Sequence, residues 1–312
     1  MSFSQSYELI SAYEACRLCP RACGVDRTRH VGACGATDTV KIGRAALHWW
    51  EEPCLVGTQG SGAIFFSHCA LGCVYCQNKR LAEGEGIEVS LERLSEIILE
   101  LQNDHHAANI NLVTASHYAP TLSVVLSALR SSAKLKIPLV WNTSGYERIE
   151  TLDMLNGLVD VYLVDFKYAD HHTANRLSRA KDYPNVALRA IAKMLEQVGD
   201  PCFGATGNLE RGVIVRHLVL PGYVDDSLAA LRILYEHFGS RVIMSIMNQF
   251  TIVDDTFDYE VFGLAREVSD TDYERVLDYA DSLGIEDYFW QEGGAASESF
   301  IPTFDGTGVV GS

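Results

Sequence analysis

Short apolar runs alternate with amphipathic segments along most of the chain after residue 60. The apolar runs predict β-strands over residues 63–67, 109–113, 139–142, 159–164, 212–220, 242–247 and 288–290. Segments with apolar residues at helical spacing predict helices over residues 91–103, 122–129, 149–156, 227–238 and 271–283, with further helices within 171–198. This alternation predicts a parallel sheet with helices on its outside, and therefore an α/β fold.

Two of the predicted helices carry start and stop signals. Ser90 is suited to cap the helix over residues 91–103. The stretch from Thr271 to Glu274 has the pattern of a capping box for the helix over residues 271–283, and Gly284 is suited to end that helix. The chain offers about six strand–helix units, fewer than the eight of a complete (β/α)8 barrel.

Composition and charge narrow the class of protein. At 312 residues with 47% hydrophobic residues, the chain suits one large α/β domain, alone or with a small appendage. The net charge is −16 and no long run of lysine and arginine is present, which argues against a nucleic acid partner. The first residues lack a basic region followed by an apolar core, and no run approaches the ~18 apolar residues of a membrane span. We therefore expect a cytoplasmic protein with no membrane partner.

Most of the nine cysteines lie in two clusters. The first cluster comprises Cys16, Cys19, Cys23 and Cys34, and the second comprises Cys69, Cys73 and Cys76. In a reducing compartment, clustered cysteines bind metal more often than they form disulfides. The second cluster follows a predicted strand with the spacing Cx3Cx2C. A 4Fe–4S cluster is bound by four thiolates, so three closely spaced cysteines indicate a cluster with one iron open to a substrate or cofactor. Zinc fits less well, because a closed structural zinc site needs four ligands.

The second cluster, with Tyr75 just before its last cysteine, resembles the radical SAM superfamily. Further blocks resemble the branch related to pyruvate formate-lyase activating enzyme, in particular its relatives with an additional cysteine-rich N-terminus. These blocks are residues 60–69, 77–78, 165–167 and 215–222. The resemblance covers about residues 16–290 and implies a partial (β/α)6 TIM-like barrel, a 4Fe–4S cluster on the three cysteines, and S-adenosylmethionine bound to the open iron. It also implies reductive cleavage of S-adenosylmethionine to a 5′-deoxyadenosyl radical, which takes a hydrogen from a substrate.

We expect residues 1–59 to form a small cysteine-rich module, residues 60–290 the barrel, and residues 291–312 a frayed tail. The four thiols of the first cluster are enough for a tetrahedral zinc site or a second iron–sulfur cluster, or they remain without metal. The arginines of this module, Arg17, Arg21, Arg27 and Arg29, are interpreted as a solvated face. Residues 48–53 are interpreted as a bridge to the barrel in which two tryptophans pack.

Ligands of parallel α/β folds collect at the carboxyl ends of the strands, so polar residues that follow predicted strands are candidates for a site. Asp165 and Lys167 follow one such strand, and strand alternation places them on the same side. They form either a structural ion pair or part of a site. The activating enzymes that the chain resembles carry Asp-x-Lys here, which implies a role near S-adenosylmethionine and the radical. Arg216 lies within an apolar strand, and its expected partner is Asp165 or the carboxylate of S-adenosylmethionine.

Other polar residues after strands are candidates for binding the cofactor. They are Thr114, Ser116, Asn142, Ser144 and Asn248. The first two follow the strand where the superfamily usually carries Gly-Gly-Glu, which this chain lacks. The next two belong to a block that resembles Asp-Thr-Asn-Gly of the activating enzymes, with asparagine in place of aspartate. Asn248 or Gln249 is suited to bond the ribose or adenine, and His117 is equally consistent with a ligand and with an ordinary loop histidine.

Three functions fit this sequence. The first is an activating enzyme that places a glycyl radical on a partner protein, and the second is the same chemistry on another protein, a peptide or a small molecule. The third is an iron–sulfur electron carrier without radical chemistry. We expect a polypeptide substrate that enters the open side of the barrel, and the alternative is a small-molecule pocket covered by residues 1–59. The expected electron donor is a flavodoxin or ferredoxin.

Overall fold

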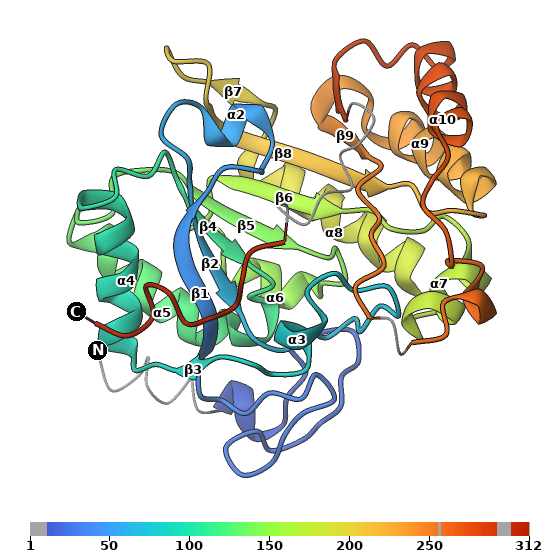
Figure 1. Ribbon diagram of the computed structural model, residues 1–312. Helices are drawn as coiled ribbons and strands as arrows, with labels where there is room; N and C mark the ends of the chain where they lie inside the picture. Colours follow the sequence, from blue (N-terminus) through green and yellow to red (C-terminus); the bar gives the residue numbers. More distant parts are fainter. Residues whose placement is uncertain (1–10, 255–256, 292–300, 312) are drawn as a thin grey trace.

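The computed structural model describes residues 11–254, 257–291 and 301–311, and they are organised around one curved sheet (Figure 1). The strands are β1 (Lys41–His48), β2 (Ser61–Phe66), β3 (Ile87–Glu88), β4 (Ile110–Val113), β5 (Leu139–Thr143), β6 (Val161–Asp165), β7 (Cys202–Phe203), β8 (Leu209–Leu218), β9 (Ile243–Met247) and β10 (Tyr288–Trp290). The order of strands across the sheet is β10-β9-β8-β6-β5-β4-β2-β1-β3, with β7 paired to β8. The strands from β2 to β10 along this path pair in parallel, whereas β1 and β3 pair antiparallel.

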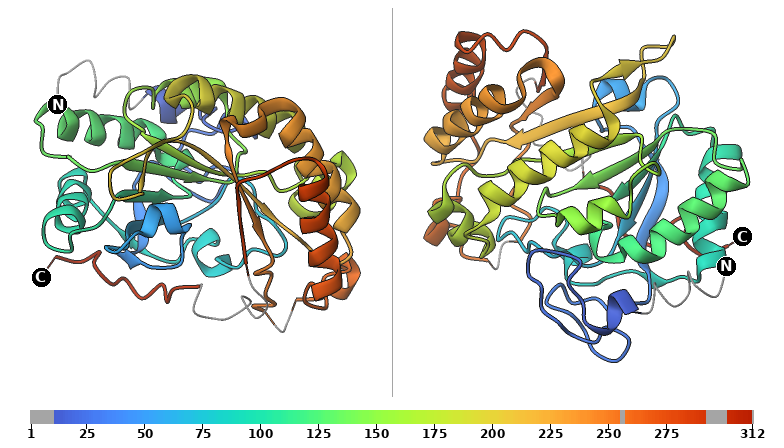
Figure 2. Two further views of the ribbon diagram at one scale, coloured as in Figure 1. Left: turned by 90° about the horizontal axis from the view of Figure 1, so that it is seen from above. Right: turned by 180° about the vertical axis from the view of Figure 1, so that it is seen from behind.

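The longer helices lie around the outside of this sheet (Figure 2). The α-helices are α2 (Pro53–Val56), α3 (Lys79–Ala82), α4 (Leu91–Asn103), α5 (Ala119–Ser131), α6 (Ile149–Asp153), α7 (His171–Ser178), α8 (Tyr183–Val198), α9 (Val224–Phe238) and α10 (Asp270–Ser282). Short 3-10 turns are η1 (Ser116–Tyr118), η2 (Gly239–Arg241) and η3 (Glu260–Phe262). No helix in the described ranges is both long and apolar enough to cross a membrane. The predicted α/β fold with a partial barrel is confirmed, since the sheet runs from β10 to β3 without closing.

The segment Lys41–His48 forms strand β1, which the sequence pattern did not predict. It pairs antiparallel with β2, so that His48 lies opposite Ser61. Charged residues and a glycine interrupt its apolar run, so neither period 2 nor a continuous apolar stretch marks it as a strand. Residues 1–59 therefore include a strand of the sheet and the short helix α2 as well as the cysteine-rich part.

The two predicted helix starts have different outcomes. Ser90 caps α4 as expected, because its side chain accepts a hydrogen bond from the Arg93 N–H at 3.1 Å. The predicted capping box at Thr271 is wrong. Ser269 caps α10 instead and accepts from the Asp272 N–H at 3.1 Å, because Ser269 has the extended backbone of an N-cap and Thr271 is already within the helix.

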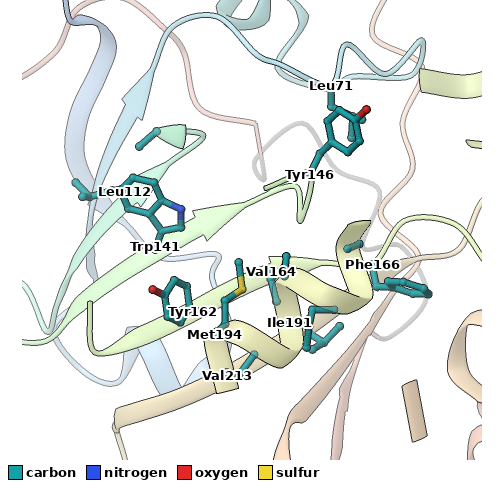
Figure 3. Close-up of a cluster of buried hydrophobic side chains, with 14 of the residues drawn as sticks. Leu71, Leu112, Trp141, Tyr146, Tyr162, Val164, Phe166, Ile191, Met194 and Val213 are labelled. Carbon is teal, nitrogen blue, oxygen red and sulfur yellow. The ribbon is translucent and has the colours of Figure 1, made fainter. Parts of the chain in front are cut away.

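The outer face of the sheet carries the main hydrophobic core (Figure 3). Ile191 and Met194 of α8 are fully buried there together with Tyr162 and Val164 of β6. Burying side chains of this size contributes roughly 1.5–3 kcal/mol each. Since side chains alternate along a strand, the neighbouring residues of β6 face the inside of the barrel.

The inside of the barrel is filled at the amino ends of the strands. Leu55 of α2 is buried in one cluster with Val140, Val161 and Ile214 from three neighbouring strands. Helix α2 therefore fills one end of the barrel interior. The remaining interior, toward the carboxyl ends of the same strands, is left for polar residues.

The C-terminal segment departs from the expected frayed tail. Residues 301–311 lie along β1, where Phe304 and Val309 are buried and Ala45 N–H donates to Thr307 O at 2.9 Å (Figure 1). The prediction of a frayed tail is wrong for this part, because two apolar side chains anchor it to the sheet. Residues 292–300 lie outside the described residues.

Candidate active site

A cavity of about 200 Å³ lies at the carboxyl ends of the parallel strands. It is lined by the thiols of Cys69, Cys73 and Cys76 and by the charged side chains of Asp165, Lys167 and Arg216. The structure thus brings together the cysteine cluster and the three predicted catalytic residues from β2, β6 and β8. Cavities at this end of a parallel sheet are where α/β folds place their ligands.

The loop that carries the three cysteines has little freedom. Leu71 N–H donates to Cys69 Sγ at 3.4 Å, and Ser178 Oγ donates to Cys73 Sγ at 3.1 Å. Burial raises the pKa of Cys69, and it raises the pKa of Cys76 to about 12. Without a bound metal, Cys69 and Cys76 therefore keep their protons at neutral pH, and a metal is needed to hold them as thiolates.

The donor set of this cavity fits an iron–sulfur cluster. Three soft thiol ligands face the same space, and Lys167 lowers the pKa of Cys69 and Cys76 against the effect of burial. Within the described ranges, no group of three or more His, Cys, Asp or Glu residues is placed to hold a single metal ion. A 4Fe–4S cluster does not require such convergence, because each cysteine binds a different iron.

A chain of ion pairs crosses the floor of the cavity. Lys167 Nζ lies 2.7 Å from Asp165 Oδ2, and Arg216 Nε lies 2.9 Å from Asp165 Oδ1. Arg216 also donates to Asn142 Oδ1 at 2.8 Å and lies 3.3 Å from Glu51 Oε2. Burial alone would raise the pKa of Asp165, but Arg216 and Lys167 outweigh it and hold that pKa below its usual range. Asp165 is therefore an ionised carboxylate that pairs with two buried cations.

Glu51 and Glu52 are functional candidates that the sequence pattern did not reveal. Glu51 lines the cavity and accepts from Asn111 Nδ2 at 3.0 Å, while burial raises its pKa. Glu52 is also buried, its pKa is raised by burial to about 7, and its Oε2 has no hydrogen-bond partner among the described residues. The only signal in the sequence is a pair of acidic residues before Pro53, the first residue of α2. Nothing local indicates that they reach the barrel interior.

Thr114, which follows β4, lines the cavity in a strained conformation. Its φ is +61°, in the left-handed region that β-branched residues avoid. Its N–H donates to Asn142 O at 2.8 Å, which fixes the backbone in this position. Asn142, Ser144 and Gln249, which are candidates for cofactor binding, line the same cavity. Backbone strain of this kind is often found at functional sites.

The structure does not bring every predicted residue to the cavity. Ser116 instead donates to the buried carboxylate of Glu147, and Asn248 N–H donates to Gln291 Oε1 at 2.9 Å. His117 is buried with its Nε2 2.8 Å from Ser67 O, and burial lowers its pKa to about 3. Of the two interpretations of His117, its position favours a structural histidine.

The first cysteine cluster forms a compact loop region next to these elements. Cys16 and Cys19 are buried, and Cys23 and Cys34 are half-buried. Burial raises the pKa of Cys19 to about 11, with smaller contributions in the same direction from Cys34 and Cys16. Burial also acts to raise the pKa of Cys23, but backbone N–H groups of the same loop lower it overall.

Two arginines of this module differ from the predicted solvated face. Arg27 is fully buried, and Arg21 is half-buried with its guanidinium bonded to backbone carbonyls. Arg17 and Arg29 are exposed, as predicted. The interpretation of the four arginines as one solvated face is therefore wrong, because these two guanidiniums tie the module to the barrel.

A scan against protein families matches residues 63–235 to the radical SAM superfamily. A relative with a similar sequence is the uncharacterized protein MJ0674 of Methanocaldococcus jannaschii. It is 26% identical over 282 residues, which cover 88% of this chain and 76% of that protein.

Solved structures with a similar fold include SuiB of Streptococcus suis. The structure of SuiB bound to S-adenosylmethionine matches with a TM-score of 0.51 at 14% identity, over 75% of this chain and 50% of that one. SuiB bound to its precursor peptide SuiA matches with a TM-score of 0.50 at 13% identity, over 73% of this chain and 47% of that one. The chain thus spans about half the length of SuiB, and at this identity the likeness shows the fold alone.

Proposed function

Because the chain belongs to the radical SAM superfamily, we propose that Cys69, Cys73 and Cys76 hold its 4Fe–4S cluster and that S-adenosylmethionine binds beside it in the cavity. When bound, the cluster supplies one electron, which converts S-adenosylmethionine into methionine and a 5′-deoxyadenosyl radical that takes hydrogen from the substrate. The observation that carries the proposal is the placement of all three thiols and a buried ion network in one cavity.

The ion network is suited to position S-adenosylmethionine. Its methionine part carries a carboxylate and an amino group, and both need charged or polar partners once water is excluded. Lys167 and Arg216 supply the cations, while Asp165 keeps them from repelling each other. Asn142, Ser144 and the backbone at Thr114 supply further polar groups in the same cavity, in place of the missing Gly-Gly-Glu.

For the substrate we propose a polypeptide segment. The sheet runs from β10 to β3 without closing, so the barrel has an open side. SuiB, which shares this fold, binds a precursor peptide, and that supports a peptide or protein substrate here. Activation of a glycyl radical enzyme is one form of such chemistry. A small-molecule substrate under residues 1–59 is the alternative.

We also propose a metal at the first cysteine cluster, either zinc or an iron–sulfur cluster, and a flavodoxin or ferredoxin as electron donor. Four thiols within one loop region support the metal. The need for one electron in each cleavage supports the donor.

The assignment of the triad is tested by the formation of 5′-deoxyadenosine. Anaerobically reconstituted, dithionite-reduced protein is expected to produce it from S-adenosylmethionine, and Cys73→Ala is expected to abolish it. Cys202→Ala is the matched control, because Cys202 is exposed and lies outside both cysteine clusters. An unchanged yield in Cys73→Ala would refute the assignment, and no product from the intact protein would favour an electron carrier without radical chemistry.

The class of substrate is tested by deuterium tracing. The reduced enzyme is incubated with S-adenosylmethionine and a deuterated protein fraction, or separately with a deuterated metabolite fraction, of the same cell. Deuterium in 5′-deoxyadenosine from the protein fraction supports a polypeptide substrate. Transfer from metabolites alone would rule it out.

A further inference from the structure

The first cysteine cluster lies directly against the loop of the second. Arg21, between Cys19 and Cys23, donates through Nε to Ala70 O at 3.1 Å and through Nη2 to Leu71 O at 3.0 Å. Both acceptors lie between the first two cysteines of the triad. The two cysteine loops are therefore joined by hydrogen bonds that start and end between metal-ligand candidates.

A second contact joins the two loops independently. A Cβ added at Gly35, the residue after Cys34, would lie 3.0 Å from Nδ1 of His68, the residue before Cys69. The backbone next to Cys34 therefore touches the side chain next to Cys69. Through these two contacts the first cluster becomes a neighbour of the triad rather than a separate appendage.

Arg27 is a fully buried cation inside the first cluster. Its guanidinium donates to Ala36 O at 3.1 Å, to His117 O at 2.7 Å and to Thr37 O, and its Nη1 lies 3.7 Å from Cys16 Sγ. It also stacks over the ring of Tyr13, at 4.9 Å from the ring centre. None of the salt bridges formed by the described residues includes Arg27.

Backbone carbonyls and an aromatic ring satisfy the hydrogen bonds of this guanidinium, and a nearby negative charge would further stabilise its buried positive charge. The Sγ of Cys16 lies 3.7 Å from Nη1 of Arg27, and a metal bound at the cluster would hold this sulfur as a thiolate. Four thiolates with either Zn²⁺ or the oxidised 4Fe–4S core give a net charge of about −2 by simple addition. A metal centre of this charge would balance Arg27.

We propose that Cys16, Cys19, Cys23 and Cys34 bind an iron–sulfur cluster, that Arg27 is its buried counter-charge, and that this cluster passes electrons to the cluster on the triad. The choice of iron over zinc rests on the contacts between the two loops and on the proposed function of the triad. The triad thiols are half-buried at the cavity, and each cleavage consumes one electron from outside. In the relay, an external low-potential one-electron donor loses one electron, the triad cluster gains it, and the first cluster returns to its starting state.

The site itself is tested in the full-length chain with Cys69, Cys73 and Cys76 all changed to alanine. After anaerobic purification and reconstitution, this variant is expected to retain about four irons and four sulfides per chain. Its control is a variant with all seven clustered cysteines changed to alanine, which is expected to hold none. Zinc, or no metal, in the triple variant would overturn the proposal.

The role of Arg27 is tested by the reduction potential of the cluster in the triple variant, followed by electron paramagnetic resonance. Arg27→Gln is expected to shift the potential to more negative values, because the added electron loses a nearby positive charge. Arg27→Lys is expected to have a reduction potential close to that of the triple variant with Arg27 intact. Arg29→Gln, at an exposed position of the same module, is expected to leave the potential unchanged. Equal potentials in all these variants would overturn the role of Arg27.

The relay is tested in the otherwise intact chain by comparing two reductants. Arg27→Gln is expected to slow 5′-deoxyadenosine formation at least tenfold with reduced flavodoxin and to leave it nearly unchanged with dithionite, which is small enough to reach the triad. Equal slowing with both reductants would overturn the relay. If the unsubstituted chain forms no 5′-deoxyadenosine with either reductant while the triple variant holds iron, the result would instead contradict the proposed function of the triad.

Discussion

The carboxylate of Asp165 is the point where removal of one charge should have the largest effect on stability. Its two oxygens pair with Lys167 at 2.7 Å and Arg216 at 2.9 Å, and its side chain is only 15% exposed. Asp165→Asn keeps the shape of the side chain but removes the carboxylate that pairs with Lys167 and leaves Arg216 with the ion pair to Glu51. Breaking a buried pair in this way costs about 3–5 kcal/mol, compared with at most about 1 kcal/mol for an exposed pair.

This loss converts into a shift of the thermal midpoint. For 312 residues the unfolding entropy is roughly 0.65 kcal/mol per degree, so the midpoint of Asp165→Asn should fall by about 5–8 °C. The assay is thermal unfolding of the anaerobically purified chain at matched iron content, followed by circular dichroism. The double variant Asp165→Asn/Lys167→Met removes the uncompensated cation and should recover at least about 2 °C of the loss.

Two results would refute this reasoning. A midpoint lowered by less than about 1.5 °C would mean that the network is screened like a surface pair. If the thermal midpoint of the double variant falls by as much as the falls of the two single variants added together, Lys167 and Asp165 do not act as a pair.

Two further predictions concern strain and pH. Thr114→Gly should raise the free energy of unfolding by about 1 kcal/mol, because glycine tolerates the φ of +61° that strains threonine. Thr114→Ala keeps a Cβ and should leave the free energy of unfolding unchanged. Equal thermal unfolding midpoints for the two variants would contradict the strain. Burial lowers the pKa of His217 to about 4, so the stability that its neutral ring contributes is complete above about pH 6.5 and is lost as pH falls toward 4, at about 1.4 kcal/mol per pH unit. Between pH 6.5 and pH 5, the free energy of unfolding measured with urea should therefore fall by about 2 kcal/mol less for His217→Gln than for the unsubstituted chain. An identical decrease in both proteins would show that the ring does not stay neutral.

Much of the barrel follows from local patterns in the sequence. Each parallel strand is an apolar run because both of its faces are buried, and each intervening helix shows one apolar face. The period of two residues in a strand is sufficient to place Asp165 and Lys167 on the same side, and the structure pairs them at 2.7 Å. The spacing of the three cysteines places them in one loop after β2, and this placement does not depend on contacts with the rest of the fold.

Other features depend on contacts between distant segments. Glu51 meets Arg216 across 165 positions of the chain because α2 inserts into the barrel, and no local pattern distinguishes an inserted loop from an exposed one. Arg27 likewise looks like an ordinary surface arginine in the sequence, and it is buried because its own cysteine-rich segment and the segment after β4 close over it. Hydrophobic periodicity records which face of a segment is covered, but the partners of a buried charge are set by how segments pack. For that reason the sequence alone determined the parallel strands, the cysteine spacing and one ion pair, while the tertiary structure decided which charges meet inside the barrel and how close the two cysteine clusters lie.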